Sequence, residues 1–305
     1  MGCVLCPRAC GADRNGGEAG ICGADNKIKI ARAAPHMWEE PPISGTRGSG
    51  TVFFSGCPLR CVFCQNRVLS RDGYGTEVSA DRLTQIFFEL KAQGVHNINL
   101  VTPTHYSAAL IPILRRVKSE LGLPIVYNCG GYESVDTLRA LDGLIDVYLP
   151  DFKYASSALS EKYSAAPDYP EIATAALAEM HRQCGAAEFD EDGIMQRGII
   201  VRHLVLPGCY RDSIEVLRII ANTVSVRDIK ISLMRQFTPD FVDKSAHPEL
   251  CRRLTTFEYQ KVIDEASRLG FDGYVQDAAS ASAIYTPDFD LTGVTHTTTR
   301  KDNNL

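Results

Sequence analysis

Three cysteines of this chain stand close together with the spacing C-x3-C-x2-C: Cys57, Cys61 and Cys64. A short loop of this kind can hold one iron–sulfur cube, because the irons of such clusters are ligated by closely spaced cysteine thiolates. Three ligands for four irons leave one iron open, and an open coordination position distinguishes a reactive metal site from a closed structural one. The spacing therefore predicts a [4Fe–4S] cluster whose free iron binds a cofactor or substrate.

A zinc site is the alternative for the same loop. Closed zinc sites usually take four ligands in paired CxxC knuckles, and no fourth cysteine follows until Cys129. An apolar, strand-like run at 52–54 precedes the loop, and Gln65 and Asn66 follow it. We therefore favour the iron–sulfur cluster.

A second group of cysteines lies at the start of the chain, with the spacing C-x2-C-x3-C-x11-C: Cys3, Cys6, Cys10 and Cys22. Four thiolates make a complete ligand set, and the glycines among them allow the backbone to curl around a metal. The set suits zinc or a second [4Fe–4S] cluster, with a slight preference for the cluster because paired CxxC knuckles are missing. A cluster would conduct electrons, whereas zinc would hold the segment closed. A mobile terminus without metal is the remaining alternative.

Composition limits the classes of function. The 305 residues are 45% hydrophobic and 23% charged, with a formal net charge of −5. This charge disfavours broad electrostatic binding to nucleic acid or to an anionic membrane. Apolar runs are too short for a membrane span, and the N-terminus lacks the pattern of a signal peptide. Eleven cysteines in such a chain indicate metal ligation in the reducing cytoplasm rather than disulfides.

The rest of the chain alternates between strand-like and helix-like segments. The expected strands are 97–101, 124–127, 145–149, 198–206, 229–233 and 274–276, and the expected helices are 80–93, 108–121, 134–141, 170–184, 212–222 and 255–268. This alternation predicts the α/β class, with a parallel sheet and helices outside it. We expect a cysteine-rich segment and connector at 1–50, a partial barrel at 51–285 and a flexible tail at 286–305.

The connector and the 155–197 region are less regular. A weak edge strand is expected at 27–32, while prolines and glycines exclude a helix from the remainder up to residue 50. His36, Glu39 and Glu40 of the connector either reach an active site or cap a loop. Residues 188–192 predict an exposed acidic loop.

Polar residues follow the ends of the expected strands, where parallel barrels carry their active sites. They are Thr102, Thr104, Asn128, Asp151, Lys153, Arg202 and Gln236. We expect these side chains to meet above the cysteine loop.

The cysteine loop and three further segments resemble a known family. Residues 56–66, G-C-P-L-R-C-V-F-C-Q-N, are similar to the cluster loop of pyruvate formate-lyase activating enzymes in the radical S-adenosylmethionine (SAM) superfamily. Residues 99–105, 147–153 and 202–208 resemble a branch of activase-like iron–sulfur proteins, the PflX type. The resemblance implies an incomplete (β/α)6 TIM-like barrel of the radical SAM type.

The resemblance also implies a cofactor and residue roles. In that family the open iron binds SAM, and an electron from the cluster splits a carbon–sulfur bond to release a 5′-deoxyadenosyl radical. Phe63 matches the aromatic residue near the adenine, Asp151 and Lys153 match an Asp-x-Lys pair beside the SAM carboxylate, and Arg202 matches an arginine of similar role.

Two positions depart from the family pattern. Thr102-Pro-Thr-His105 stands where activases carry Gly-Gly-Glu for the SAM amino group, so Thr102 or Thr104 would replace that contact. Asn128-Cys129 stands in place of Asp-Thr. Cys129 is a candidate hydrogen-atom donor or a buried thiol, and His105 and His203 are candidates for proton transfer or for structural roles.

We therefore expect a radical SAM oxidoreductase that cleaves SAM and abstracts hydrogen, most specifically a glycyl-radical-enzyme activase-like protein. Its expected partners are a glycyl radical enzyme or another protein or peptide substrate, and a flavodoxin- or ferredoxin-type electron donor. Radical modification of a peptide or small molecule is the alternative within the enzymes. A non-catalytic iron–sulfur electron carrier or redox sensor is the alternative from another class, and it predicts no SAM binding.

Overall fold

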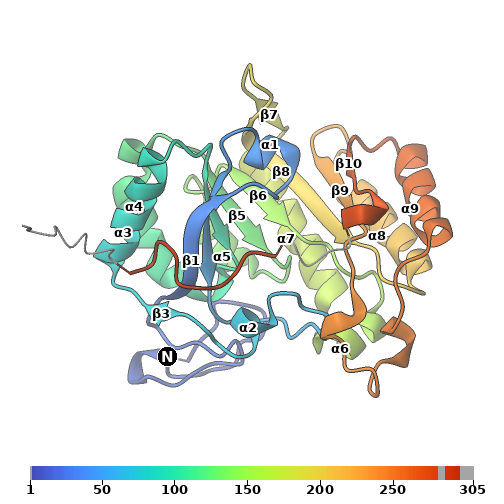
Figure 1. Ribbon diagram of the computed structural model, residues 1–305, viewed down its shortest axis with the longest axis horizontal. Coiled ribbons are helices and arrows are strands. Elements are labelled where there is room, and N and C mark those ends of the chain that lie inside the picture. Colours follow the sequence, from blue (N-terminus) through green and yellow to red (C-terminus); the bar gives the residue numbers. More distant parts are fainter. Residues whose placement is uncertain (1, 281–285, 296–305) are drawn as a thin grey trace, which may run out of the picture.

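A curved, largely parallel sheet forms the centre of the computed structural model, which describes residues 2–280 and 286–295 (Figure 1). In the described residues, successive strands of the parallel run pair as neighbours in chain order. They are β2 (Ser49–Phe54), β4 (Ile98–Val101), β5 (Ile125–Cys129), β6 (Val147–Pro150), β8 (Met195–Leu204), β9 (Lys230–Met234) and β10 (Gly273–Val275). Consecutive parallel strands need long crossover connections, and helices supply them here.

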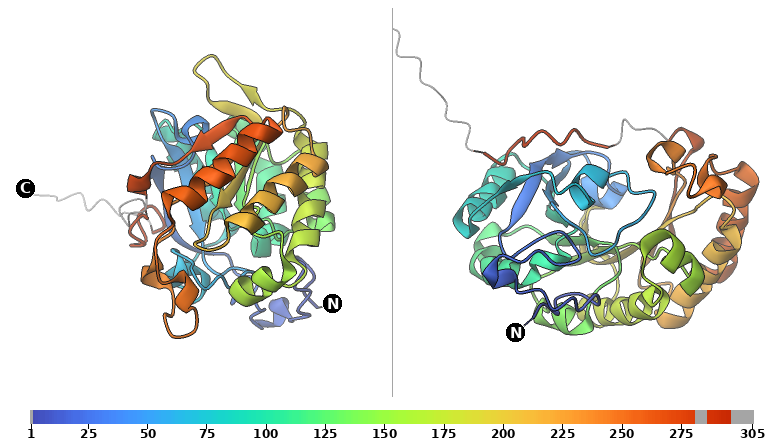
Figure 2. Two further views of the ribbon diagram at one scale, coloured as in Figure 1. Left: turned by 90° about the vertical axis from the view of Figure 1, so that its right-hand side faces the viewer. Right: turned by 90° about the horizontal axis from the view of Figure 1, so that it is seen from below.

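The major helices lie around the outside of the sheet (Figure 2). They are α3 (Ala80–Ala92), α4 (Ser107–Leu121), α5 (Val135–Ala140), α7 (Tyr169–Cys184), α8 (Tyr210–Thr223) and α9 (Thr256–Leu269). Capping residues determine where a helix begins and ends. In α9, the Thr255 side chain accepts from the Glu258 backbone while the Glu258 side chain returns to Thr255, and Gly270 ends the helix at φ 81°.

The α/β class with a largely parallel sheet is confirmed, and the sheet is consistent with a partial barrel. Within the described residues, the parallel run holds seven strands, which correspond to the strand-like run at 52–54 and the six strands expected after it, one more than the (β/α)6 barrel that the resemblance implies. The pairing path ends at β10 on one side and at the antiparallel strands β1 and β3 on the other, so the described strands form an open sheet.

The connector builds the antiparallel side of this sheet. Strand β1 (Lys29–His36) pairs with β2 and, through two residues, with β3 (Thr76–Glu77). The expected strand at 27–32 is therefore longer and shifted. The exclusion of a helix was wrong at α1 (Pro41–Ser44), because prolines fit a first helical turn, where backbone N–H groups have no intrahelical acceptor.

Residues 286–295 differ from the expected flexible tail. The Leu291 N–H donates to the Ala31 carbonyl at 3.0 Å, and the Ala33 N–H donates to the Thr292 carbonyl at 2.9 Å. This segment crosses in front of β1 in Figure 1. Gly293 adopts φ 72°, and a Cβ there would come within 1.9 Å of the Ala33 carbonyl oxygen. The remaining tail residues, 296–305, lie outside those that the structure describes.

The shorter elements lie between these parts. They are the helices α2 (Arg67–Ser70) and α6 (Ser157–Ser164), strand β7 (Glu188–Phe189), and 3-10 turns at Arg14–Gly16, Thr104–Tyr106, Pro239–Phe241, Pro248–Leu250 and Ala278–Ser280. The acidic segment 188–192 is exposed as expected, beside the β7–β8 pairing. In the described part of the chain, no helix has both the length and the apolar character that crossing a bilayer requires.

Candidate functional site

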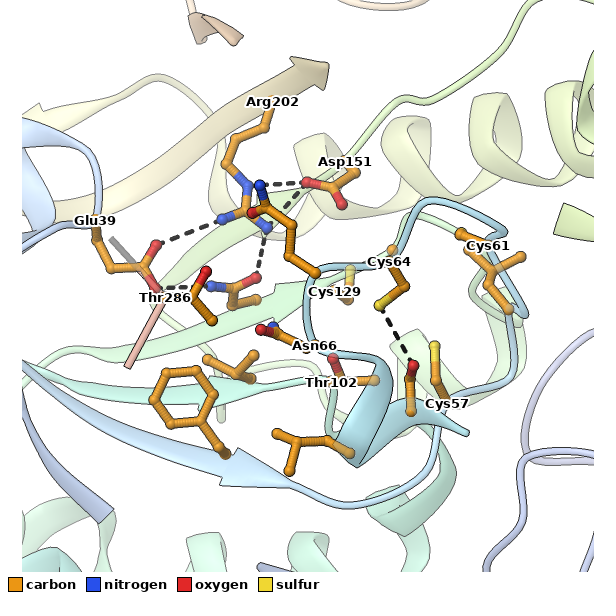
Figure 3. Close-up of a pocket in the computed structure, with 18 of the residues that line it drawn as sticks. Glu39, Cys57, Cys61, Cys64, Asn66, Thr102, Cys129, Asp151, Arg202 and Thr286 are labelled. Atoms are coloured by element: carbon orange, nitrogen blue, oxygen red, sulfur yellow. Dashed lines mark hydrogen bonds and ion pairs between the residues drawn. The ribbon is translucent and has the colours of Figure 1, made fainter. Parts of the chain in front are cut away.

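A cavity of about 240 Å³ lies between the cysteine loop and the carboxyl ends of the parallel strands (Figure 3). The loop after β2 forms one end, and the segment after β1 forms the other. Between them, residues at or just after the carboxyl ends of β4, β5, β6, β8 and β9 contribute side chains. This is the edge of a parallel sheet where active sites are found.

All three cysteines of the loop line this cavity. The Ser164 hydroxyl donates to the Cys61 sulfur at 3.0 Å, and the Ser70 hydroxyl donates to the Cys64 sulfur at 3.3 Å. The Cys57 N–H donates to the Cys22 carbonyl at 3.1 Å. The loop is thus held on several sides with its sulfurs toward the cavity.

The chemistry of these thiols fits an iron–sulfur cluster. Burial, with the neighbouring thiols, raises the pKa of Cys57 well above its usual range, and burial also raises the pKa of Cys64. Metal ligation requires thiolates, so cluster binding would displace these protons. No group of three or more His, Cys, Asp or Glu side chains in the described residues converges on a single metal position. A cube does not require such convergence, because each cysteine binds a different iron.

A charged network stands beside the cysteines. Asp151, just after β6, accepts from Arg202 Nε at 2.9 Å and forms an ion pair with Lys153. Arg202 also donates to Asn128 Oδ1 at 2.6 Å and pairs with Glu39 at 3.4 Å. Adjacent parallel strands bring these residues together, and an isolated bridge joins Asp151 to Arg202 directly.

Burial and charge act in opposite directions in this network. Burial disfavours the ionised form of Asp151, but Arg202 and Lys153 outweigh it and hold the pKa of Asp151 below its usual value. At Glu39 burial prevails over Arg202 and raises the pKa. Asp151 therefore remains ionised and fixes two cations at the cavity wall.

Most of the residues expected after strand ends do meet at the cavity. The lining includes Thr102, Asn128, Asp151, Lys153, Arg202 and Gln236. Thr102 has φ 58°, unusual for a β-branched residue, and its N–H donates to the Asn128 carbonyl at 2.8 Å. The Gln236 side chain accepts from Gln276 Nε2 at 3.1 Å.

Two other residues expected to contact the cofactor, Thr104 and Phe63, are not among those that line this cavity. Thr104 is buried in a 3-10 turn, where its hydroxyl donates to Glu133 at 2.8 Å. Phe63 is buried with its ring against Phe237, at 6.3 Å between centroids. Neither side chain lines the cavity, because the turn after β4 and the end of the cysteine loop direct them into the packed interior.

Several lining residues had no sequence signal for this position. Glu39 and Glu40 were ambiguous in the connector, and Gln65 and Gln276 are single amides without a pattern. Thr286 was assigned to the tail. Antiparallel pairing of β1 and the return of residues 286–295 along it explain most of these positions, and such long-range contacts leave no local pattern.

The other candidates for proton or hydrogen-atom transfer are neutral groups. Burial lowers the pKa of both His105 and His203 to about 4. Each ring contacts a backbone carbonyl, of Ser55 at 2.7 Å and of Phe152 at 2.6 Å, and neither ring lines the cavity. Cys129 does line it, and burial raises the pKa of this thiol well above its usual range.

The N-terminal cysteines lie behind the cysteine loop, outside the cavity. Cys6 and Cys22 are buried, whereas Cys3 and Cys10 are half-buried. Burial raises the pKa of Cys6 to about 12, while the backbone N–H of Ala12 lowers the pKa of Cys10.

Arg8 joins this segment to the cysteine loop. It donates to the carbonyls of Pro58 at 2.9 Å, Ser164 at 3.0 Å and Ala165, and it lies over the Tyr132 ring at 5.2 Å.

Comparison with known proteins agrees with this arrangement. The Radical SAM superfamily model matches residues 51–185. Uncharacterized protein MJ0674 of Methanocaldococcus jannaschii is 26% identical over 284 residues, covering 88% of this chain and 75% of that protein.

Two solved structures share the fold at low identity. SuiB of Streptococcus suis, bound to its precursor peptide SuiA, is 12% identical with a TM-score of 0.51, over 75% of this chain and 48% of SuiB. A spore photoproduct lyase variant is 11% identical with a TM-score of 0.51, over 73% of this chain and 74% of the lyase. The chain thus spans about half the length of SuiB.

Proposed function

We propose that this chain, whose residues 51–185 match the radical SAM superfamily model, is a radical SAM enzyme that abstracts hydrogen from a peptide or protein substrate after reductive cleavage of SAM. The most specific form of this proposal is activation of a glycyl radical enzyme, supported by the likeness of residues 56–66 to the activase loop. One observation carries the proposal. A single cavity holds three cysteine thiols at one end and the paired cations Lys153 and Arg202 along its wall.

Each cofactor has residues suited to hold it. Cys57, Cys61 and Cys64 would ligate the [4Fe–4S] cluster. Lys153 and Arg202 suit the SAM carboxylate, because charge-assisted donors bind carboxylates strongly. When bound, the cluster and SAM supply a one-electron cleavage of a carbon–sulfur bond that yields a 5′-deoxyadenosyl radical.

The chain's own residues prepare the site for that chemistry. Asp151 compensates the buried charges of Lys153 and Arg202, so both cations stay fixed before any ligand enters. The hydroxyls of Ser70 and Ser164 donate to cysteine sulfurs, and such bonds stabilise thiolate ligands and tune cluster potential. Apolar walls such as Leu59 and Val101 help to exclude water.

A peptide or protein substrate is supported by two independent points. The loop resemblance is to enzymes that act on a protein glycine, and SuiB, which shares the fold, is bound to a precursor peptide. We propose a cytoplasmic enzyme that receives electrons from a flavodoxin- or ferredoxin-type donor. The N-terminal cysteines would hold a second [4Fe–4S] cluster or zinc.

The test is anaerobic reconstitution with iron and sulfide, reduction with dithionite and quantification of 5′-deoxyadenosine by mass spectrometry. Wild type is expected to form the product, and the triple variant Cys57→Ala/Cys61→Ala/Cys64→Ala is not. A matched control replaces Cys184, Cys209 and Cys251 by alanine, because these cysteines do not line the cavity. Equal product from both triple variants would refute the assignment.

The electron-carrier alternative makes a separate prediction. It requires a reducible cluster in a protein to which SAM does not bind. Equilibrium binding of SAM to the reconstituted protein distinguishes the two. If SAM binds but no 5′-deoxyadenosine forms without substrate, then added substrate must trigger cleavage for the enzyme proposal to stand.

A further inference from the structure

The cavity has a second chemically distinct end, opposite the cysteines. Glu39 and Glu40 follow β1 there, and Figure 3 shows Glu39 across the cavity from Cys57, Cys61 and Cys64, with Arg202 reaching toward it. Glu39 accepts from Asn128 Nδ2 at 3.3 Å and pairs with Arg202 at 3.4 Å.

The carboxylates of the cavity outnumber its cations. Asp151, Glu39 and Glu40 stand against Lys153 and Arg202 among the described lining residues. Lys153 is paired with Asp151, and Arg202 is shared among Asp151, Glu39 and Asn128. When all the carboxyl groups are ionised, one negative charge is left without a matching cation at the Glu39–Glu40 end.

Glu40 carries the unmatched group. The residue is only 9% exposed, and among the described residues its Oε2 atom has no hydrogen-bond partner, although the carboxyl also has a side-chain hydrogen bond with Ser232. A buried, unsatisfied carboxylate oxygen is costly, and Glu40 is one of the residues that line the cavity. Burial raises the pKa of Glu40 to about 7, despite the opposing charge of Arg202. The negative charge of Glu39 also raises this pKa, and the hydrogen bond with Ser232 lowers it. The charge of Glu40 in turn raises the pKa of Tyr274.

The rim beside Glu40 is apolar. Trp38 lines the cavity and is 61% exposed. An alkyl chain that passes this rim would contact the Trp38 side chain. Its end would then reach the carboxylates of Glu39 and Glu40.

We propose that Glu40, with Glu39 and Trp38, forms a substrate subsite for an alkylammonium group, such as a lysine side chain. The inference rests on the proposed function and names its substrate class. A compact ammonium suits one free carboxylate oxygen, whereas a guanidinium prefers two oxygens in parallel. An anionic ligand would be repelled, and a neutral donor would leave the excess charge uncompensated.

Calorimetric titration of the reconstituted, SAM-loaded protein tests the subsite. The probes are an acetylated, amidated tripeptide with a central lysine, the same peptide with norleucine, and pentylamine as a free amine. We expect the lysine peptide to bind at least tenfold more tightly than the norleucine peptide. If pentylamine binds as tightly as the lysine peptide, a small amine is sufficient for the subsite. If pentylamine binds more weakly, the subsite recognises a lysine within a peptide.

Variants assign the effect to Glu40. Glu40→Gln should weaken binding of the lysine peptide at least tenfold and leave the norleucine peptide unchanged. Glu133→Gln is the matched control, because Glu133 is also a buried carboxyl but does not line the cavity. Thermal melts of both variants establish that they are folded, and Glu40→Asp should restore part of the preference.

The inference fails if wild type does not distinguish lysine from norleucine, or if Glu40→Gln keeps the distinction. This failure is separable from that of the proposed function. Wild type that forms 5′-deoxyadenosine without lysine preference overturns the subsite alone. A lysine preference that depends on Glu40, in protein that neither binds nor cleaves SAM, overturns the proposed function and supports the subsite.

Discussion

The two groups of cysteines differ in what surrounds them. Cys57, Cys61 and Cys64 face a cavity whose wall carries fixed cations, and two of their sulfurs accept hydrogen bonds from serine hydroxyls. The N-terminal group lies outside that cavity, among glycine-rich turns. Thiols thus line the cavity in one group and lie away from it in the other.

The two groups differ in whether a ligand can reach their sulfurs, although they lie close to each other. A metal site reacts when a ligand can reach it, and here only the first group adjoins the described central cavity. The two groups are nevertheless joined directly, since the Cys22 carbonyl accepts from the Cys57 N–H at 3.1 Å. We infer that the N-terminal segment supports the reactive loop from behind.

Matched single substitutions should show the largest contrast. Cys61→Ala is expected to reduce dithionite-driven formation of 5′-deoxyadenosine more than about 100-fold, because a cube with two protein ligands is poorly held. Cys6→Ala should reduce it only a few-fold. The amount of 5′-deoxyadenosine per chain, together with the iron and zinc content, is measured for both variants. Equal losses of product would contradict the proposed difference between the two cysteine groups.

A second expectation concerns Glu133, a buried carboxyl whose charge acts on both Cys6 and Cys129. Its partners are the neutral hydroxyls of Thr104 and Tyr127, and burial raises its pKa to about 7. When the pKa of a carboxyl is higher in the folded state than in the unfolded state, the folded protein loses stability as the pH rises from the unfolded-state pKa through the folded-state pKa.

Glu133→Gln should therefore remove a cost that develops between about pH 4.5 and pH 7 in wild type, on the order of 3 kcal/mol. Urea unfolding at pH 5 and pH 8 measures the free energy of both proteins. The free energy of unfolding of the variant should increase relative to that of wild type at the higher pH. A constant difference across this range would show that Glu133 titrates normally.

The cations of the cavity wall supply the third contrast. Lys153→Met should weaken SAM binding about tenfold, or about 1.4 kcal/mol, because it removes one charge-assisted donor. Lys118→Met is the matched control, since Lys118 pairs with Asp146 at 2.7 Å outside the cavity. Equilibrium binding of SAM compares them, and similar losses would point to general destabilisation.

The smallest effect is expected where the two cysteine groups are joined. Arg8→Ala removes three bonds to the carbonyls of Pro58, Ser164 and Ala165 and should cost about 1–3 kcal/mol. Hydrogen exchange of residues 3–24 should accelerate. Arg60→Ala is the control, because Arg60 makes one bond to the Ile21 carbonyl at 3.2 Å. Unchanged exchange in Arg8→Ala would place the support elsewhere.

The predictable part of this site depended on local spacing and on strand order. The cysteine loop is continuous in sequence. Asp151 and Lys153 follow β6, and Arg202 lies near the carboxyl end of β8; such strand ends meet at one edge of a parallel sheet. Thr104 follows a strand as well, yet a single 3-10 turn directs its hydroxyl to Glu133. Side-chain direction within such a turn is decided by packing rather than by position in the sequence.

The carboxylate end of the cavity could not be derived in this way. Glu39 and Glu40 reach it because β1 pairs with β2 in antiparallel fashion, and Thr286 reaches it because the chain returns along β1. The helix α1 was missed because its prolines occupy the first turn, where they are tolerated. These features depend on contacts between distant segments.

The return of residues 286–295 along β1 also bears on self-association. An uncovered edge strand offers unpaired backbone groups to a second chain, and β3 covers β1 only at Lys29 and Ile30. Residues 291 and 292 occupy the backbone groups of Ala31 and Ala33 beyond that point. A chain truncated after residue 285 would expose this small, apolar stretch of edge. Residues 286–295 thus act as the molecule's own protection against edge-to-edge aggregation.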